Sequence, residues 1–303
     1  MAKKWTLSTI DSLKGQIYIV TGGNSGIGYE TVKALVSLDA TVIMASRNKE
    51  RAEDAKKSIL EDYPDGSINI ILLDLANMDS IHNFAKLYKD KYNALNGLVN
   101  NAGVMFTPYR KTDDGFEYQN GINHLGHFLL TNLLFDALND TDNSRIVNVS
   151  SMAHKFGKMN FDNYLFEKEG SYNKYKSYGR SKLSNLLFTF ELDRRLRNQG
   201  IDIKVLAAHP GGAKTKLTRD VHGFFSKLFN LFSQSADRGA LPTLRALLDP
   251  NAESGDYYGP SGLLEIKGDP VKVKPRKKAY NEVDAKKLWL KSEELTNKRF
   301  IIA

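Results

Sequence analysis

Short apolar runs alternate along this chain with longer segments in which apolar residues recur every three or four positions. The runs are rich in Ile, Val and Leu, which predicts buried β-strands. Six such runs lie at residues 16–21, 41–46, 68–73, 97–100, 145–150 and 203–208. Between the first two, residues such as Ile27, Thr31 and Leu35 mark one face of a helix, and similar stripes follow the later strands.

Strands that are apolar throughout need cover on both faces, and here each is followed by a helical pattern. The alternation predicts an α/β fold with a doubly wound parallel sheet of the Rossmann type, in three α/β/α layers. We expect residues 1–303 to form a single domain, because no linker, repeat or low-complexity tract interrupts the chain. In such a sheet, ligands bind in the crevice at the carboxyl ends of the strands.

The composition excludes several classes of protein. The 303 residues include no cysteine, which removes disulfides, thiolate zinc sites and thiol catalysis, and we predict no metal site. The first nine residues lack the apolar core of a signal peptide. No stretch approaches the roughly 20 apolar residues of a membrane span. We therefore expect a cytoplasmic protein without a transmembrane segment.

The net charge of +8 raises the question of an anionic partner. Most lysines are scattered along polar helix faces, and no aromatic and basic reading motif accompanies them, so we predict no nucleic-acid binding. The densest basic cluster consists of Lys267, Lys272, Lys274, Arg276, Lys277 and Lys278. It lies among Pro and Gly residues and is predicted to be a solvated loop.

The turn from Thr21 to Gly28 follows one predicted strand and opens a predicted helix. Its glycines allow positive φ and close backbone approach, and the start of the helix offers free N–H groups to a pyrophosphate. The glycine spacing GxxxGxG differs from the common dinucleotide-binding spacing GxGxxG. The prediction of a phosphate-binding turn therefore rests on its position between a strand and a helix. The predicted cofactor-binding residues of this turn are Gly22, Asn24, Ser25, Gly26, Ile27 and Gly28.

The end of the second predicted strand indicates which dinucleotide binds. It carries Ser46, Arg47 and Asn48. No acid is present to hold the ribose hydroxyls of NAD, whereas an arginine there accommodates a 2′-phosphate. NADP(H) is therefore favoured over NAD(H). The alternative is that Arg47 covers the strand end and pairs with Glu50 or Glu53.

Two further strand ends are expected to line the same crevice. The third strand ends at Asp74 and Leu75, which are placed to reach the adenine. The fourth is followed by Asn101, Ala102 and Gly103, whose small side chains let the backbone lie close to the cofactor. These five residues complete the part of the cofactor site that the strand pattern predicts.

Tyr178 and Lys182 lie one helical turn apart, downstream of the fifth predicted strand. Positions i and i+4 share a helix face, so the phenol and the ammonium can converge. A free tyrosine has a pKa near 10. A lysine one turn away, together with the positive nicotinamide in the oxidised complex, favours the phenolate and lowers that pKa. We predict that Tyr178 exchanges a proton with a carbonyl or alcohol, and that Lys182 supports it and holds the nicotinamide ribose.

Three polar residues are added to this candidate site. The fifth strand ends in Ser150 and Ser151, and one hydroxyl can stabilise the substrate oxygen as charge develops. We choose Ser151 and keep Ser150 as the alternative. Asn123 lies in a predicted helix, where asparagine is a mediocre former, and could hold a water that relays protons to Lys182. A surface or capping asparagine is the alternative there.

These motifs together resemble the short-chain dehydrogenase/reductase superfamily. The resemblance runs in order over roughly residues 14–216, from TGxxxGIG at 21–28 and NNAG at 100–103 to YxxxK at 178–182 and PGxxxT at 210–215. It implies a catalytic tetrad of Asn123, Ser151, Tyr178 and Lys182. It also implies cofactor binding by Pro210, Gly211 and Thr215, with Thr215 at the nicotinamide carboxamide, and NADP selection by Arg47.

Three longer matches look like one branch of that superfamily, the retinol-dehydrogenase and WW-domain-oxidoreductase-like branch. They are VSSMAH at 149–154, SYGRSKLSNLLF at 177–188 and YYGPxG at 257–262. The interval between Ser151 and Tyr178 is longer than in the shorter members. It holds an insertion at 155–172 whose aromatic residues include Phe161, Tyr164, Phe166 and Tyr172. We predict that the insertion shapes the substrate pocket; cover for the sheet edge is the alternative.

A Phe-rich stretch at 224–232 follows the last motif. It predicts an apolar helix within residues 216–235, outside the rhythm of the sheet. Three interpretations stay open: a lid over a lipophilic substrate, a patch in weak peripheral contact with a membrane, and a core helix.

These inferences predict an NADP(H)-dependent oxidoreductase that interconverts a lipophilic aldehyde or ketone and its alcohol by hydride transfer, with tyrosine as general acid and base. Its partner is a small-molecule carbonyl or alcohol, and the sequence is compatible with a homo-oligomer. A non-catalytic NADP(H)-binding regulator of the same fold is one alternative, which the intact tetrad disfavours. A protochlorophyllide-reductase-like enzyme is another, which the lack of cysteine disfavours.

Overall fold

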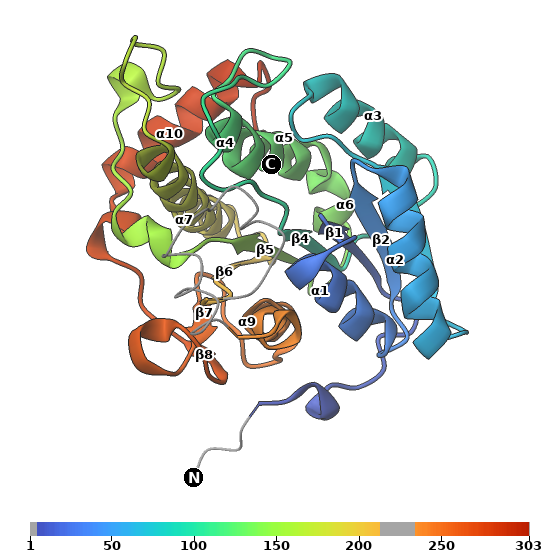
Figure 1. Ribbon diagram of the computed structural model, residues 1–303. Helices are drawn as coiled ribbons and strands as arrows, with labels where there is room; N and C mark the ends of the chain where they lie inside the picture. Colours follow the sequence, from blue (N-terminus) through green and yellow to red (C-terminus); the bar gives the residue numbers. More distant parts are fainter. Residues whose placement is uncertain (1–4, 213–233, 303) are drawn as a thin grey trace.

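Eight strands form one sheet in the computed structural model, which describes residues 5–212 and 234–302 (Figure 1). Their order across the sheet is β3-β2-β1-β4-β5-β6-β7-β8. The strands are β1 Ile17–Thr21, β2 Thr41–Ser46, β3 Ser67–Leu72, β4 Gly97–Asn100, β5 Arg145–Val149, β6 Lys204–Ala208, β7 Tyr257–Pro260 and β8 Pro270–Lys272. The six predicted strands are confirmed, and each end lies within one residue of its predicted position. The sequence did not predict β7 and β8, and β8 is antiparallel to β7.

Helices cover both faces of the sheet, which confirms the three predicted layers (Figure 1). On one face Val32 and Leu35 of α1 and Ile59 of α2 pack with Val20 and Met44 of the sheet. The helices on this face are α1 Gly26–Val36, α2 Lys49–Asp62 and α9 Ala236–Leu248. Those on the other face include α3 Met78–Lys89, α5 Gly126–Leu133, α6 Phe135–Asn139, α7 Lys174–Asn198 and α10 Glu282–Leu295. The double cover explains why the strands are apolar throughout.

The direction of winding reverses between β1 and β4, which are neighbours in the sheet. The helix after β1 is α1, on one face, whereas the chain after β4 leads through α4 Tyr118–Asn120 to α5 on the other. The reversal leaves a crevice between the carboxyl ends of the two strands. The predicted motifs lie around this crevice.

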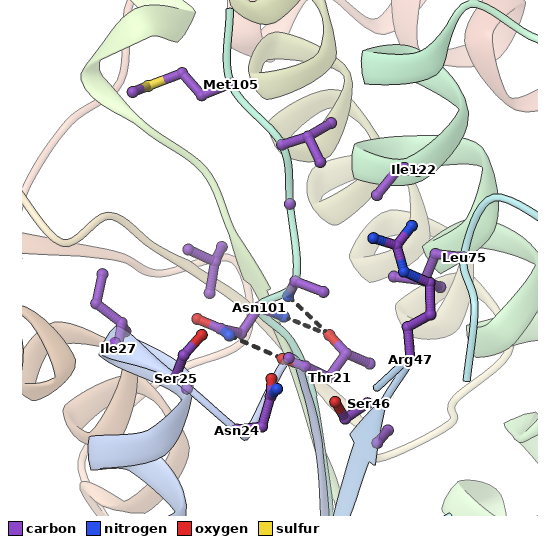
Figure 2. A pocket seen from close by; sticks show the side chains of 18 of the residues that line it. Thr21, Asn24, Ser25, Ile27, Ser46, Arg47, Leu75, Asn101, Met105 and Ile122 are labelled. Carbon is purple, nitrogen blue, oxygen red and sulfur yellow. Dashed lines mark hydrogen bonds between the residues drawn. The ribbon is translucent and has the colours of Figure 1, made fainter. Parts of the chain in front are cut away.

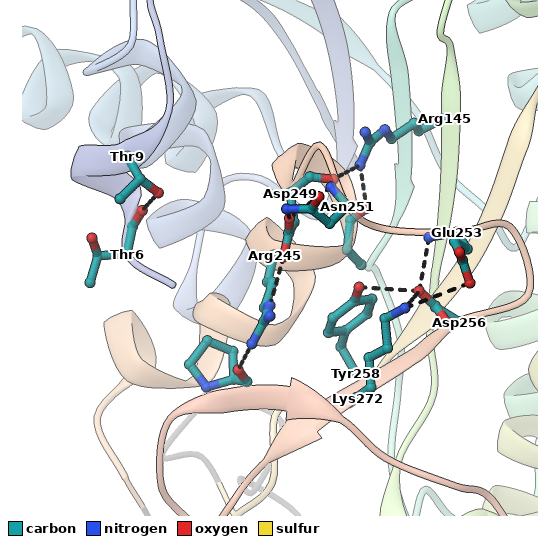
Figure 3. A network of polar contacts seen from close by, with 12 residues as sticks. Thr6, Thr9, Arg145, Arg245, Asp249, Asn251, Glu253, Asp256, Tyr258 and Lys272 are labelled. Carbon is teal, nitrogen blue, oxygen red and sulfur yellow. Dashed lines mark hydrogen bonds and ion pairs between the residues drawn. The ribbon is translucent and has the colours of Figure 1, made fainter. Parts of the chain in front are cut away.

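A polar network fastens the last two strands to α9 (Figure 3). Arg245 of α9 pairs with Asp249 at 2.9 Å, and its Nη1 donates to the carbonyl of Pro270, the first residue of β8, at 2.5 Å. The Lys272 ammonium at the end of β8 lies 2.7 Å from the Asp256 carboxylate, just before β7. These side-chain contacts hold β7 and β8 in place, because both strands are short and form few backbone pairs.

Some predictions concern residues that the structure does not describe. The Phe-rich stretch at 224–232 and Thr215 lie outside the described residues, as do residues 216–233 of the possible lid segment at 216–235. Within residues 5–212 and 234–302, no helix has both the length and the apolar character needed to cross a membrane.

Candidate active site

One cleft at the carboxyl ends of the strands brings together nearly all of the predicted site residues (Figure 2). The predicted residues that line it are Gly22, Asn24, Ser25, Gly26, Ile27, Gly28, Ser46, Arg47, Asn48, Asp74, Leu75, Asn101, Ala102, Gly103, Ser151, Tyr178, Lys182, Pro210 and Gly211. Ser150, the alternative to Ser151, lines it as well. Asn123 lies behind the wall of the cleft rather than on it.

The turn between β1 and α1 has the geometry that an anion needs. Gly22 and Gly26 have φ of 67° and 55°, where side chains are strained. A Cβ on Gly28 would overlap the carbonyl oxygen of Gly22, so only glycine lets helix and turn approach this closely. The side chain of Ser25, at the start of α1, makes no capping hydrogen bond. The first N–H groups of α1 are thus left without a side-chain acceptor.

Other helices contrast with α1 in this respect. Four begin at an asparagine whose side chain accepts hydrogen bonds from the first turn: α2 at Asn48, α3 at Asn77, α7 at Asn173 and α10 at Asn281. In α2, Asn48 Oδ1 accepts from the N–H of Arg51 at 2.8 Å. The Asn48 side chain therefore already has a structural partner, although the residue lines the cleft as predicted.

Thr21 and Asn101 fix the distance between the ends of β1 and β4 (Figure 2). The Thr21 hydroxyl accepts hydrogen bonds from the N–H groups of Asn101 and Ala102, both at 2.9 Å. Asn101 Nδ2 donates to the Thr21 carbonyl at 2.8 Å. Thr21 was not among the predicted site residues. The sequence feature that could have identified Thr21 is a polar residue at the end of an otherwise apolar strand.

Arg47 lies at the end of β2 with a largely exposed side chain. Its Nη1 is 3.2 Å from the hydroxyl of Tyr118 and 3.8 Å from the carboxylate of Asp74. The alternative partners, Glu50 and Glu53, make no ion pair with it, and both residues are described. The arginine thus reaches over the cleft toward the ends of β3 and α4 rather than back along α2.

Two more arginines line the same end of the cleft, and sequence reasoning missed both. Arg51 follows from the first turn of α2, and Arg110 comes from the loop after β4. The guanidinium carbon of Arg110 lies 3.5 Å from the centre of the Tyr118 ring, a cation–π contact. Among the described residues, three guanidinium groups and one carboxylate, that of Asp74, line this end of the cleft, which leaves an excess of positive charge.

At the other end, α7 carries Tyr178 and Lys182 on one face, as predicted. Both side chains are buried. Lys182 Nζ donates to the carbonyl of Val149, at the end of β5, at 3.0 Å. It lies 5.8 Å from the centre of the Tyr178 ring. The strand end therefore holds the ammonium beside the phenol.

The expected lowering of the Tyr178 pKa is wrong for the chain by itself. Burial raises the pKa of Tyr178 to about 12, and a hydrogen bond with Ser151 opposes the shift only in part. Burial also lowers the pKa of Lys182 from 10.5 to about 8. Desolvation of both charged forms outweighs the attraction that the i, i+4 spacing suggested. The phenol is thus protonated at neutral pH and is suited to donate a proton.

The two serines at the end of β5 have different surroundings. The Ser151 side chain lies close enough to the Tyr178 hydroxyl to lower the pKa of the phenol, and its oxygen accepts from the N–H of Ala153 at 3.2 Å. The Ser150 hydroxyl is buried and donates to the carbonyl of Lys182 at 2.8 Å. Ser151 therefore faces the phenol, whereas Ser150 fastens the strand to α7. This arrangement supports the choice of Ser151.

Asn123 lies in a short π-helix, Gly121–Leu125, between α4 and α5. It is fully buried, so the surface alternative is wrong. Its Oδ1 accepts from the Val104 N–H at 2.8 Å, and its Nδ2 donates to the Val104 carbonyl at 3.0 Å and to the Ser181 hydroxyl at 2.9 Å. The amide thus joins the loop after β4 to α7. Its part in a proton relay stays a prediction.

Phe106 contacts the candidate acid and was not predicted from the sequence. Its ring centre lies 5.2 Å from that of Tyr178 and 4.7 Å from that of Tyr175. Its backbone has a φ of 55°, which is rare for a bulky residue. The N–H of Phe106 donates to Gln119 Oε1 at 2.8 Å, which helps to hold this conformation. An apolar aromatic wall therefore stands beside the phenol.

The aromatic residues of the insertion at 155–172 have a more indirect position. Tyr164 and Phe166 are buried, and neither belongs to the residues that line the cleft. Arg180 of α7 holds this segment by donating to the carbonyls of Asn163 and Tyr164 at 2.7 and 2.6 Å. Tyr172 reaches the site through its hydroxyl, which donates to the carbonyl of Thr107 at 2.7 Å. The role of the insertion in the substrate pocket stays a prediction.

Comparison with known proteins agrees with this arrangement. The model of the short chain dehydrogenase family matches residues 16–223. Retinol dehydrogenase 14 of Mus musculus is 40% identical over 299 residues, covering 93% of this chain and 86% of the relative. Retinol dehydrogenase 11 of Homo sapiens is 40% identical over 283 residues, covering 91% of this chain and 84% of the relative.

Solved structures share the fold. A crystal structure of an uncharacterised protein from Mycobacterium paratuberculosis superposes with a TM-score of 0.83 at 36% identity, covering 99% of this chain and 100% of that one. A short chain dehydrogenase from Shigella flexneri, complexed with NADP, gives a TM-score of 0.65 at 22% identity, covering 82% of this chain and 97% of that one. The second likeness concerns the fold alone.

Proposed function

Because this chain belongs to the short-chain dehydrogenase family, we propose that it is an NADP(H)-dependent oxidoreductase that interconverts a lipophilic aldehyde or ketone and its alcohol. Oxidoreductase chemistry with a nicotinamide cofactor follows from the family; the preference for NADP(H), the substrate class and the roles of the residues are the proposal. One observation carries the proposal: a single cleft joins two sets of residues. At one end a protonated, buried Tyr178 lies beside Ser151 and Lys182, and three arginines line the other end.

The cleft fits a dinucleotide with a 2′-phosphate. The N–H groups at the start of α1, which Ser25 leaves uncapped, would hold the pyrophosphate. Arg47 and its neighbour Arg51 would bind the 2′-phosphate, because planar guanidinium groups form strong charge-assisted hydrogen bonds with phosphate oxygens. Pro210 and Gly211, with Thr215 beyond them, would lie at the nicotinamide. When bound, the cofactor supplies the hydride for reduction or accepts it in oxidation.

The residues of α7 and β5 would handle the proton. Tyr178 donates its phenolic proton to the carbonyl oxygen of the substrate, and the Ser151 hydroxyl donates a hydrogen bond to the same oxygen. Lys182, held by the Val149 carbonyl, would hydrogen-bond the nicotinamide ribose and stabilise the phenolate that remains. Asn123 would keep the loop after β4 in place and hold a water that returns a proton toward Lys182.

Two observations support a lipophilic substrate. The aromatic ring of Phe106 packs against the Tyr178 ring, and the Tyr175 ring packs against Phe106 in turn, so apolar aromatic surface adjoins the phenol. The relatives at 40% identity are named retinol dehydrogenases, so a lipophilic alcohol or its aldehyde is the first class to assay.

The test is oxidation of NADPH and NADH with a panel of aldehydes and ketones, using wild type, Tyr178→Phe and the control Tyr280→Phe. Tyr280 is half exposed and packs on Phe190, away from the cleft. We expect turnover with NADPH in wild type and control and a loss of about 10²- to 10⁴-fold in Tyr178→Phe, the range of general acid–base catalysis. Full turnover without the phenolic hydroxyl would overturn the mechanism. Tight NADPH binding without turnover of any substrate would favour the regulator.

A further inference from the structure

Three segments that are far apart in the sequence form one continuous surface beside α7. They are residues 155–158 after β5, 263–267 between β7 and β8, and 274–278 before α10. Lys155 Nζ lies 3.2 Å from a carboxylate oxygen of Glu265. Lys278 Nζ donates to the carbonyls of Lys155 at 3.0 Å and Gly157 at 2.6 Å. Each of the outer segments is thus fastened to the first.

We call this surface the Leu–Lys face. Its exposed residues are Phe156, Lys158, Leu263, Leu264, Lys267, Lys274, Arg276 and Lys277, with Lys278 at intermediate exposure.

The apolar part of the Leu–Lys face is unusually exposed. Leu263 and Leu264 are 87% and 70% exposed, and Leu263 has the highest value among the large apolar residues that the structure describes. Phe156, next to Lys155, is 52% exposed. Adjacent leucines in water gain nothing for the fold, and clusters of exposed apolar residues mark interaction sites.

The loop that carries the two leucines has a defined backbone. The Glu265 N–H donates to the Gly262 carbonyl at 2.9 Å, and the Gly262 N–H donates to the Lys267 carbonyl at 2.9 Å. Leu264 and Glu265 have φ of 55° and 59°, the left-handed region that non-glycine residues rarely adopt. The backbone thus adopts a strained turn whose effect is to project leucine side chains away from the protein.

The charged part of the face has few acids to balance it. Lys272 differs from the other members of the basic cluster at 267–278, because it pairs with Asp256 (Figure 3). Among the described residues, Lys158, Lys274, Arg276 and Lys278 have no ion pair with a carboxylate. Partial burial lowers the pKa of Lys278, and the charges of Lys158 and Arg276 lower it further. These like charges repel one another, and an anionic surface would relieve the repulsion.

We propose that the Leu–Lys face docks the protein on an anionic lipid bilayer. Leu263, Leu264 and Phe156 would enter the boundary between headgroups and acyl chains, while the cations contact lipid phosphates. Exposed apolar side chains and unpaired cations on linked segments match such a bilayer in both respects. A symmetric contact between two copies of the face would instead bring like charges together.

The face adjoins the candidate active site. Phe156 packs so closely on Gly179, the residue after Tyr178, that a Cβ there would come within 2.8 Å of its ring. The Gly212 N–H donates to the Ile266 carbonyl at 2.8 Å, which links the leucine loop to the end of the Pro210–Gly211 segment lining the cleft. A docked molecule would therefore hold its cleft next to the bilayer. The docking itself does not depend on the proposed reaction.

The experiment is flotation of the full-length protein with vesicles of phosphatidylcholine alone and with added phosphatidylserine. We expect binding to the anionic vesicles only, weaker as salt is raised. Replacing Leu263 and Leu264 together by Ser, or Lys274, Arg276 and Lys277 together by Gln, should each weaken binding by about tenfold or more. All five side chains are exposed, so the folded state should survive both sets of changes, which thermal unfolding by circular dichroism checks.

The matched controls carry the same changes at exposed positions elsewhere. They are Leu87→Ser with Leu290→Ser, and Lys14→Gln with Lys57→Gln and Lys287→Gln, all of which should bind as wild type does. Binding that both face variants retain would overturn the proposal, because another part of the chain would then be responsible. Failure of wild type to bind anionic vesicles would also overturn it. So would a wild-type dimer, seen by sedimentation velocity without lipid, that the face variants abolish.

Discussion

The two ends of the cleft are built on different principles. The proposed phosphate end, at the β1–α1 turn and Arg47, consists of glycine backbone, uncapped N–H groups and exposed arginines. The proposed catalytic end consists mainly of buried side chains, and hydrogen bonds fix some of them, as with Lys182 on Val149 and Ser150 on Lys182. Binding of a large anion can thus rely on solvated groups, whereas proton transfer needs groups whose pKa is set by burial.

The sharpest difference should appear in the pH dependence of stability at the catalytic end. Folding lowers the pKa of Lys182 from 10.5 to about 8, so between these pH values the unfolded chain binds more protons than the folded one. Stability from this group therefore rises with pH across the window, by up to about 3 kcal/mol. Lys182→Met lacks this rise. Urea unfolding from about pH 7 to about pH 10 should show the stability of Lys182→Met relative to wild type falling across that range.

The control for this experiment is Lys287→Met, at an exposed lysine of α10. Its stability should run parallel to that of wild type over the same range of pH. If Lys182→Met also ran parallel to wild type, the lysine would not be desolvated, and the contrast between the two ends would lose its basis.

The second largest expected effect distinguishes the roles of Ser150 and Ser151. Ser151→Ala should lower kcat by about a hundredfold, because the hydrogen bond to the substrate oxygen is lost where charge develops. Ser150→Ala should lower the free energy of unfolding by about 1 kcal/mol, since the Lys182 carbonyl loses a donor, and reduce kcat less. Steady-state kinetics and urea unfolding of both variants measure the two effects. The reverse pattern would move the catalytic role to Ser150.

At the phosphate end, Arg47→Ala should lower the ratio of kcat/KM for NADPH to that for NADH by about tenfold, the loss of one charge-assisted contact. The effect should fall on the KM for NADPH and leave kcat nearly unchanged, because the residue is remote from the phenol. Lys49→Ala, two residues further along the chain and not among the residues that line the cleft, serves as the control. An unaltered ratio in Arg47→Ala would contradict the assignment of NADP(H).

The smallest effect compares two helix starts. Asn77→Ala removes a cap that accepts from the Ser80 N–H at 2.8 Å and should lower the free energy of unfolding by about 1 kcal/mol. Ser25→Ala removes no capping bond and should change stability much less, yet weaken NADPH binding. Thermal unfolding and fluorescence titration with NADPH check both. Equal losses of stability would show that Ser25 caps α1 after all.

Local features were predictable from the sequence, and those that depend on distant packing were not. Six strands and the strained glycine turn follow from patterns within a few residues, and so does the shared face of Tyr178 and Lys182. The π-helix around Asn123 and the stacking of Arg110 on Tyr118 arise only when segments meet in space. The short strand β8 is antiparallel to β7 and has no apolar run of its own, so the sequence pattern did not predict it. For Tyr178 the spacing predicted a neighbour correctly, but the pKa follows burial, which spacing does not encode.

The Asn123 amide pairs with both the N–H and the carbonyl of Val104, as one peptide group pairs with another across a sheet. Such mimicry requires a donor and an acceptor at the end of a short side chain. Aspartate would set oxygen against oxygen, leucine would leave two peptide groups of Val104 without partners, and glutamine is one methylene too long. A side chain in a helix some twenty residues further along therefore determines the backbone path of the loop that leads to Phe106. Substitutions of other loop side chains would change the surface of the loop and leave its backbone path the same.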